Sequence, residues 1–529
     1  MINEGCHVSS EGFRVEAVRS AGCEVRCAVI QGVCRSGKLL WIGGSLCLLA
    51  CCLVAKGEEN EPRQSWEGSG PALLNLFEST LVDVIAQSEK SVVAIARVRL
   101  NRPGEVFNLE PRLDPFGGLA DRSAPPQPGD PDFIPTEYGA GVIVDAKGLI
   151  LTVAQLIGEE SEYYVTTCDR RTFRARVLAA DPRSDLAVLA VPAEGLQPIV
   201  LGNAATLRKG QIVIALGNPY AIARDGQVCA SWGIVANLGR KAPPMPTDRD
   251  PTGKPTIHHF GTLIQTDAKL GFLSNGGALI NLKGEMVGLL TTLPVATGHE
   301  TPAGYAYPVD ETFLRVLNHL KRGEEVEYGL LGVQPEGLSF AEKAEGIQGT
   351  RVDRVVPGTP ADRVGLRSQD LITAVNGAPL YDDDDLVLAV GRLPVDATVT
   401  LDVVRDQRRF QVQTVLSKYP VRGRKVVTAE PKKWRGMTVD YVSAVSSSPE
   451  GFWQFSRPTD AVAVVAVDEG SPAWKAGLRP GAFISHVENE PVTTPKVFYQ
   501  VVSKHSGPVR LRLVPDGSEN YQPVLIVAP

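Results

Sequence analysis

One string of residues occurs twice in the C-terminal part of this chain. Pro-Ala-x-x-x-Gly-Leu-Arg occupies residues 360–367 and, at the same spacing, residues 472–479. Each copy is preceded by a β-branched run and followed by a second strand-like run, an Asn-containing turn and a helical stretch. A repeat of one supersecondary unit predicts two copies of a small mixed α/β module.

Length and composition limit the rest of the chain. A chain of 529 residues is too long for one core, so about three domains are expected. The 52 Gly and 39 Pro imply many turns and favour short strands over long helices. The net charge of −6 is spread without a basic stripe, which argues against a nucleic-acid partner.

Between residues 139 and 309, short apolar runs alternate with turn signals, which predicts an all-β barrel or sandwich. The flanking segments differ: helical spacing over 72–85 and 309–320 predicts two helices, and 92–98 is suited to a strand. Two irregular stretches, 101–136 and 241–255, are expected to be exposed loops. The apolar runs are 141–144, 148–152, 186–191, 211–216, 233–235, 262–265, 277–280 and 286–291.

An N-terminal segment predicts export. Arg35 and Lys38 precede an apolar run over 39–55, after which the sequence turns polar. This run lies at the border between a long signal segment and a short transmembrane helix, so a cleaved signal, an uncleaved anchor and a lipid-modified Cys51 all stay open. The remaining chain is expected in the periplasm or cell envelope.

Cysteines are concentrated at the N-terminus. Seven of nine lie at or before Cys52, which excludes a disulfide-built domain. Cys168 and Cys229 are expected to be two free, buried thiols, with a pair between them as the alternative.

The two repeated modules resemble PDZ domains. In that family, backbone N–H groups of an apolar, Gly-containing loop bind a peptide carboxylate, and the peptide adds as an extra strand. The matching loops are Leu330-Leu331-Gly332-Val333 and, less cleanly, Gly436-Met437-Thr438-Val439. Four carboxylates, Asp382–Asp385, stand where the groove helix begins. Acidic residues are favourable at a helix N-terminus, so this role is preferred to a metal site.

Two PDZ-like copies behind an exported β-rich region resemble the HtrA (Deg) serine proteases, over roughly residues 80–529. The resemblance implies a mainly β chain, with a trypsin-like double β-barrel followed by two small α+β PDZ domains. The local strings that carry it are 138–144, 185–189, 217–219, 233–240, 265–268 and 275–279. The implied organisation is a targeting segment 1–56, a linker 57–71, a trypsin-like domain 72–322, PDZ domains 326–418 and 434–529, and a linker 419–433 between them.

The same resemblance identifies the catalytic positions. Acyl transfer on this fold needs a Ser nucleophile, a His base, an Asp that orients the His, and backbone donors for the oxyanion. Here the base position holds Gln155, the Asp survives as Asp185, and the nucleophile position holds Asn275. Leu273 replaces the glycine of the oxyanion loop. An amide has no usable basicity near neutral pH, so we expect Gln155 to hydrogen-bond Asp185 instead.

Three nearby side chains do not rescue this chemistry. Ser274 adjoins the nucleophile position, but a shift of one residue points its side chain away. His258 and His259 precede a strand rather than the site. No metal or cofactor is expected.

The expected function is therefore that of an exported pseudoprotease that binds polypeptide C-termini or unfolded segments in envelope protein quality control. The resemblance further implies a homotrimer and active relatives as partners, with membrane contact only through the N-terminal segment. Two alternatives stay open: a weak or unconventional serine endopeptidase, and a structural envelope scaffold.

Overall fold

A computed structural model describes residues 70–100, 135, 137–218, 226–241, 262–269, 275–292, 304–421, 423–445, 460–514 and 524–528. The predicted targeting segment, the loop 101–134 and most of the loop 241–255 lie outside these residues. All contacts reported below lie within the compact unit formed by residues 73–529. Among the described helices, none combines the length and apolar character needed to cross a membrane.

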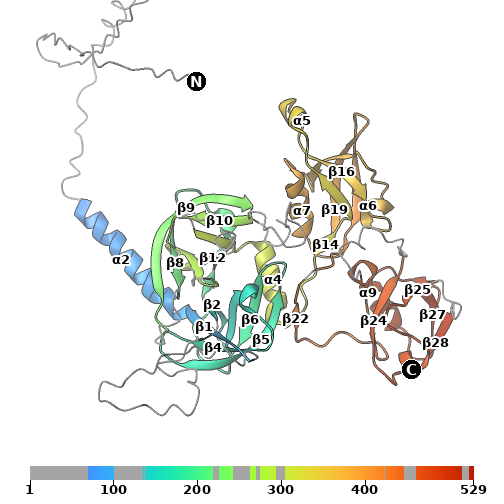
Figure 1. The fold of residues 1–529 in the computed structure, drawn as a ribbon, viewed down its shortest axis with the longest axis horizontal. Coiled ribbons are helices and arrows are strands. Elements are labelled where there is room, and N and C mark those ends of the chain that lie inside the picture. Colours follow the sequence, from blue (N-terminus) through green and yellow to red (C-terminus); the bar gives the residue numbers. More distant parts are fainter. Residues whose placement is uncertain are drawn as a thin grey trace, which may run out of the picture. The chain divides into compact units, whose positions relative to one another are not determined.

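The first barrel is a six-stranded sheet closed on itself (Figure 1). The order is β5-β4-β1-β2-β3-β6, and a pairing between β5 and β6 closes it. Its large apolar side chains, including Ile95, Ile150 and Leu189, are fully buried in the core. The strands are β1 (Val92–Arg99), β2 (Glu137–Asp145), β3 (Leu149–Val153), β4 (Ser161–Thr166), β5 (Thr172–Asp181) and β6 (Leu186–Ala190).

The second barrel repeats this plan with the order β11-β8-β9-β10-β13-β12, closed by a pairing between β11 and β12. A short strand, β7 (Val200–Leu201), adds in parallel to β12. The barrel strands are β8 (Ile212–Gly217), β9 (Cys229–Lys241), β10 (Thr262–Thr266), β11 (Ala278–Asn281), β12 (Glu285–Thr291) and β13 (Gly304–Pro308). The predicted double barrel is therefore confirmed.

Two helices flank the barrels where helical spacing predicts them. Helix α2 (Gly70–Ser88) packs Leu81, Val84 and Ile85 against the core. Helix α4 (Glu311–Lys321) begins after Asp310, whose side chain accepts a hydrogen bond from the N–H of Phe313 at 2.9 Å. Its predicted apolar face is buried: Phe313, Val316, Leu317 and Leu320.

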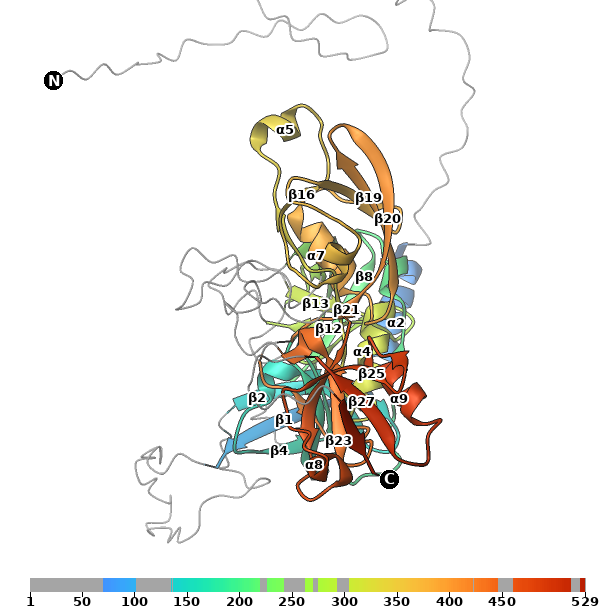
Figure 2. The same ribbon diagram turned by 90° about the vertical axis from the view of Figure 1, so that its right-hand side faces the viewer.

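Each repeat forms a separate sheet with one groove helix. The first contains strand order β15-β16-β17-β19-β20 and helix α7 (Asp383–Gly391), which lie together in Figure 2. Its strands are β15 (Val333–Glu336), β16 (Thr350–Val355), β17 (Leu371–Val375), β19 (Thr398–Arg405) and β20 (Arg408–Val415). The repeated Pro-Ala string begins the short helix α6 (Pro360–Arg363).

The second repeat has the same order, β23-β24-β25-β27-β28, and helix α9 (Pro495–Val502). Its Pro-Ala string begins α8 (Pro472–Lys475). The strands are β23 (Met437–Tyr441), β24 (Val462–Val467), β25 (Phe483–Val487), β27 (Val509–Leu513) and β28 (Val524–Val527). Both modules thus have an edge strand, β15 or β23, followed by the repeated string.

Two further short strands join distant parts of the chain. Strand β14 (Gly329–Leu330) pairs with β21 (Ser417–Lys418), the two ends of the first module. Strand β22 (Val426–Val427), in the predicted linker 419–433, pairs with Ala179 and Ala180 of β5. This linker is thus partly built into the first barrel's sheet.

The cysteine prediction is correct for the oxidation state and wrong for burial. Cys168 and Cys229 are both free thiols, but Cys168 is half-buried and Cys229 is exposed. Cys229 is the first residue of β9 and lies on the same side of the strand as the buried Gly233 and Val235. Its exposure therefore comes from its place at the end of the strand, which the residue type does not indicate.

Candidate functional site

Asp185, the predicted catalytic position that holds a carboxylate, lies immediately before β6 and is buried, with 3% of its surface exposed. Its backbone has a φ of 55°, in the left-handed region that few residues other than Gly adopt. The carbonyl of Asp185 accepts a hydrogen bond from the N–H of Ala154 at 2.9 Å. This contact ties the start of β6 to the end of β3.

Gln155 comes from the short 3-10 helix η3 (Ala154–Leu156), which follows β3. Its side-chain Nε2 donates to Oδ2 of Asp185 at 2.6 Å, and its backbone N–H donates to Oδ1 at 2.9 Å. The expected hydrogen bond between Gln155 and Asp185 is therefore present. At the predicted base position, an amide donor thus lies beside this carboxylate.

Tyr307 of β13 is a third partner of Asp185 that we did not predict. Its hydroxyl donates to Oδ2 at 2.9 Å, and the side chain is buried. The residue comes from the second barrel, so this bond joins the two barrels at the site. No short-range pattern signals it, because Tyr307 lies in a five-residue strand that our sequence analysis did not predict.

Burial raises the pKa of Asp185 from 3.8 to about 6, although the hydrogen bonds from Gln155 and Tyr307 oppose this shift. The folded state therefore binds a proton more tightly than the unfolded state between these two values. The contribution of Asp185 to the free energy of unfolding is therefore greatest at low pH and is lost as the pH rises through about 6.

Asp185→Asn should remove this dependence. Relative to the variant, the wild type should lose roughly 3 kcal/mol of unfolding free energy between pH 3 and pH 7, because the pKa rises from 3.8 to about 6 and each pH unit in this window corresponds to about 1.4 kcal/mol. Urea denaturation of both proteins across this range measures the difference, and titration of other groups cancels in the comparison. A difference that does not change with pH would contradict the raised pKa.

Asn275 lies in the turn before β11, and its side chain is also committed to a structural contact. Its Oδ1 accepts a hydrogen bond from the N–H of Thr292 at 3.1 Å. Its carbonyl accepts from the N–H of Ala140 at 2.8 Å, so the turn is held against β2. The next residue, Gly276, has a φ of 88°, and a Cβ there would collide with the carbonyl of Ala140.

The site therefore contains a buried carboxylate and two primary amides. The amide nitrogen of Gln155 donates to Asp185 and has no basic lone pair, so it cannot remove a proton from a nucleophile. Within the described residues, no His forms a hydrogen bond with Asp185, Gln155 or Asn275. The predicted oxyanion position Leu273 and the neighbours Ser274, His258 and His259 lie outside the described residues.

The first predicted peptide-binding loop connects β14 to β15. Leu330 pairs with Ser417. The carbonyl of Leu331 accepts a hydrogen bond from the N–H of Ala361, and the carbonyl of Gly332 accepts one from the N–H of Val356. Gly332 has a φ of 88°, and a Cβ would collide with Thr359. The loop is thus anchored to the repeated string by its carbonyl groups. Val333 then begins β15.

The second loop is anchored in the same way. The carbonyl of Gly436 accepts from the N–H of Asp468 at 2.7 Å, and the carbonyl of Arg435 accepts from Ala473 at 3.2 Å. Met437, Thr438 and Val439 continue as β23. Trp434 pairs with Met437 across a tight turn, which has no counterpart in the first loop.

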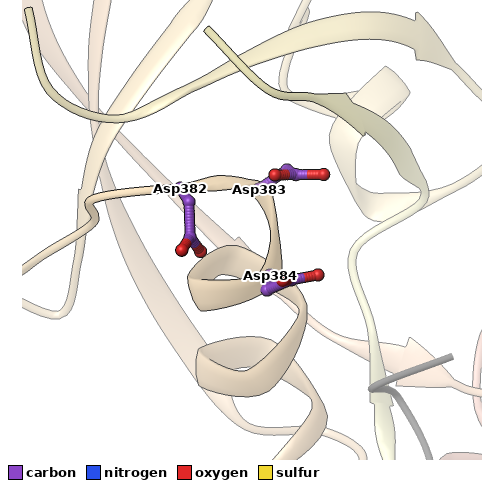
Figure 3. A group of neighbouring side chains, drawn as sticks. All are labelled: Asp382, Asp383 and Asp384. Atoms are coloured by element: carbon purple, nitrogen blue, oxygen red, sulfur yellow. The ribbon is translucent and has the colours of Figure 1, made fainter. Parts of the chain in front are cut away.

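The acidic cluster at the start of α7 holds a lysine of the second barrel. Carboxylate oxygens of Asp382, Asp383 and Asp384 lie within 4.8 Å of one another around the first turn (Figure 3). Asp382 is the N-cap and accepts from the N–H of Asp385, as its position predicts. Lys241 places its Nζ 2.5 Å from Oδ1 of Asp382 and 3.2 Å from Oδ1 of Asp385. The Lys241 ammonium thus offsets the negative charge of this acidic cluster.

We expect this cluster to leave divalent cations unbound. Millimolar Ca²⁺ or Mg²⁺ should shift the melting temperature by less than about 2 °C, because a cation would have to displace Lys241. Differential scanning calorimetry of the wild type, with and without each ion, makes the measurement. A saturable rise of several degrees, abolished in Asp382→Asn, would contradict the expectation.

Comparisons with known proteins agree with the fold. A family model for a trypsin-like peptidase domain matches residues 139–289, and models for PDZ domains match 329–416 and 464–514. A probable periplasmic serine endoprotease DegP-like of Ectopseudomonas mendocina is 30% identical over 471 residues, 84% of this chain and 94% of the relative. A protein of the same name from Pseudomonas fluorescens is 32% identical over 386 residues, 71% of this chain and 77% of the relative.

Among solved structures, the HtrA-type protease AlgW with decapeptide is similar at 22% identity and a TM-score of 0.47. The match covers 64% of this chain and 98% of that chain.

Proposed function

Because this chain belongs to the family of DegP-like (HtrA) periplasmic serine endoproteases, we propose that it is an exported member that has lost proteolytic chemistry and retains peptide binding. Its ligands are polypeptide C-termini or unfolded segments, which it binds in the cell envelope. The names of its relatives support a periplasmic location. Attachment to the membrane through residues 39–55 is part of the same proposal.

The observation that carries the proposal is the hydrogen bond from Nε2 of Gln155 to Asp185 at 2.6 Å. In an active triad this carboxylate orients a His that accepts a proton from Ser. Here it holds an amide that cannot accept one. Asn275 offers no hydroxyl, and its Oδ1 is used by Thr292. A protease lacking one triad member keeps only about 10³–10⁴-fold catalysis over water, and here two positions differ.

Peptide binding is supported by the edge strands of the two PDZ domains. A polypeptide can add to an exposed sheet edge through backbone hydrogen bonds, which require no particular side chain. Such recognition suits exposed termini of many unfolded proteins. The loop 330–333 leads into this edge strand in the first domain, and the loop 436–439 is the corresponding element of the second domain.

The proposal is tested by protease and binding assays on the same purified full chain. Casein turnover should equal the buffer background, and a serine-directed fluorophosphonate should label nothing. The same sample should bind members of a random C-terminal heptapeptide library. Matching peptides with an amidated C-terminus serve as the control for carboxylate recognition.

The family's activity provides the alternative, a weak or unconventional endopeptidase. Fluorophosphonate-sensitive cleavage that disappears in Ser274→Ala would establish this alternative and overturn the loss of chemistry. If the chain neither binds any peptide nor cleaves casein, the remaining alternative is a structural scaffold of the cell envelope.

A further inference from the structure

The two PDZ domains can be compared position by position along their edge strands. In each domain, the carbonyl of a loop glycine accepts a hydrogen bond from the N–H of the residue directly after the second sheet strand. Gly332 accepts from Val356, and Gly436 accepts from Asp468. Both edge strands then contain a register shift at the third residue, at Pro335 and at Val439. Val333 therefore corresponds to Met437, and Pro335 to Val439.

Alternation decides which backbone groups face an incoming peptide. Backbone groups of successive strand residues point to opposite edges. Since Gly332 and Gly436 face the neighbouring strand, the N–H groups of Val333 and Met437 point to the open edge. A peptide that adds as a strand must bond to these groups and to those two residues further along.

In the second PDZ domain, these outward N–H groups are already bonded within the chain. The N–H of Met437 donates to the carbonyl of Trp434 at 3.0 Å, and Trp434 donates back to Met437 at 2.8 Å. The N–H of Val439 donates to the hydroxyl of Tyr499 at 3.3 Å. The N–H of Tyr441 donates to Oδ1 of Asp440 at 2.8 Å. An incoming strand would have to displace all three partners.

Side chains hold this closed arrangement in place. The ring of Trp434 packs edge-on against Phe498 of α9, with centroids 5.9 Å apart. The hydroxyl of Tyr499 donates to the carbonyl of Lys432, and the Lys432 ammonium lies 4.7 Å from the Tyr499 ring. Residues 432–434 are therefore fastened to α9, across the position that a bound peptide would take.

The first PDZ domain lacks both elements of this closure. Leu330, which corresponds to Trp434, pairs with Ser417 of β21, whereas Trp434 pairs with Met437 of its own edge strand. Tyr499 is the fifth residue after the N-cap Thr494; the fifth residue after the N-cap Asp382 is Val387, which has no hydroxyl and is much smaller. On β15, Pro335 stands where Val439 stands on β23, and it has no N–H to donate.

We infer that the second PDZ domain is closed by Trp434 and Tyr499, so that polypeptide C-termini are bound at the edge of β15 in the first PDZ domain alone. This inference rests on the proposed peptide binding and adds which groove is used. Because Pro335 cannot donate, a peptide on β15 is held mainly by its last residues and its carboxylate.

Amide hydrogen exchange of the full chain tests the closure without any ligand. The N–H groups of Met437 and Val439 should exchange at least about tenfold more slowly than that of Val333. Tyr499→Phe removes a single oxygen and should accelerate exchange at Val439 while leaving Met437 unchanged. Equal exchange at Val333 and Val439 in the wild type would overturn the closure.

Reciprocal variants test the choice of groove. The probe is the tightest heptapeptide selected from a random C-terminal library, measured by calorimetry with the full chain. Wild type should bind one peptide per chain, and Val387→Tyr should weaken binding at least about tenfold. The double variant Trp434→Ala with Tyr499→Val should bind two. Circular dichroism verifies that each variant is folded.

Two peptides per wild-type chain, or full binding by Val387→Tyr, would overturn the inference. No binding by wild type would overturn the proposed function instead, and the exchange rates would still decide whether the second groove is closed.

Discussion

Casein cleavage is expected to rise from background to an inhibitor-sensitive rate when Gln155→His and Asn275→Ser are combined in one chain. Nε2 of Gln155 already lies 2.6 Å from Oδ2 of Asp185, so a His at this position would find its orienting carboxylate in place. The gain should be at least about 10³-fold over wild type, since the triad acts as a unit. Adding Leu273→Gly should contribute up to about 10²–10³-fold more by restoring an oxyanion donor.

Three controls make this result specific to the triad. Asn275→Ser alone and Gln155→His alone should stay at background, and Gln155→His with Asn275→Ala should show no fluorophosphonate labelling. A wild type that cleaves as fast as the double variant would contradict the assignment of these positions. An inactive double variant that becomes active only with Leu273→Gly would locate the remaining defect in the oxyanion loop.

The second large effect is expected at Lys418, at the end of the first PDZ domain. Its side chain is only 4% exposed, and its Nζ lies 3.0 Å from Glu325, 3.0 Å from Glu327 and 2.8 Å from Asp440. Burial alone would lower the pKa of this ammonium, but the three carboxylates outweigh burial and raise it. Lys418 thus neutralises three acidic groups from two segments of the chain, residues 325–327 and strand β23.

Lys418→Met should destabilise the protein by about 3 kcal/mol, because it leaves three carboxylates together with no buried cation between them. Urea denaturation followed by circular dichroism measures the loss. Lys433→Met is the matched control: its ion pair with Asp468 is about half-exposed and should be worth less than about 1 kcal/mol. Equal losses in the two variants would contradict a special role for burial at Lys418.

The sequence predicts the parts of this fold that depend on local patterns. The capped helix after Asp310 and the acidic N-terminus of α7 follow from residue types that act within one turn. The contact between Gln155 and Asp185 could be predicted because the family resemblance aligns both positions. Strand β5 is absent from our sequence prediction. Its apolar residues Phe173, Ala175 and Val177 alternate with polar ones, and this alternation is typical of a strand.

Other features depend on contacts between segments that are far apart in the chain, and no local pattern encodes them. Tyr307 reaches Asp185 from 122 positions away, and Lys241 reaches Asp382 from 141 positions away. The closure by Tyr499 likewise depends on the fold, because its hydroxyl accepts from Val439 only when β23 and α9 lie side by side. The sequence therefore predicts peptide binding by both glycine loops, the second with a less clean match, whereas the two loops share only their carbonyl contacts in the structure.

The pairing of β22 with β5 bears on how this protein can be divided into pieces. Strand β5 is one of the two strands whose pairing closes the first barrel, and residues 426–427 pair with Ala179 and Ala180 near its C-terminal end. Thr428 adds a hydrogen bond to the carbonyl of Leu178 at 2.7 Å. A fragment that stops at the end of the first PDZ domain would uncover these backbone groups, and bare strand edges promote aggregation. Fragments for expression should therefore extend through Ala429, so the barrel's true C-terminal boundary lies beyond the domain that follows it in sequence.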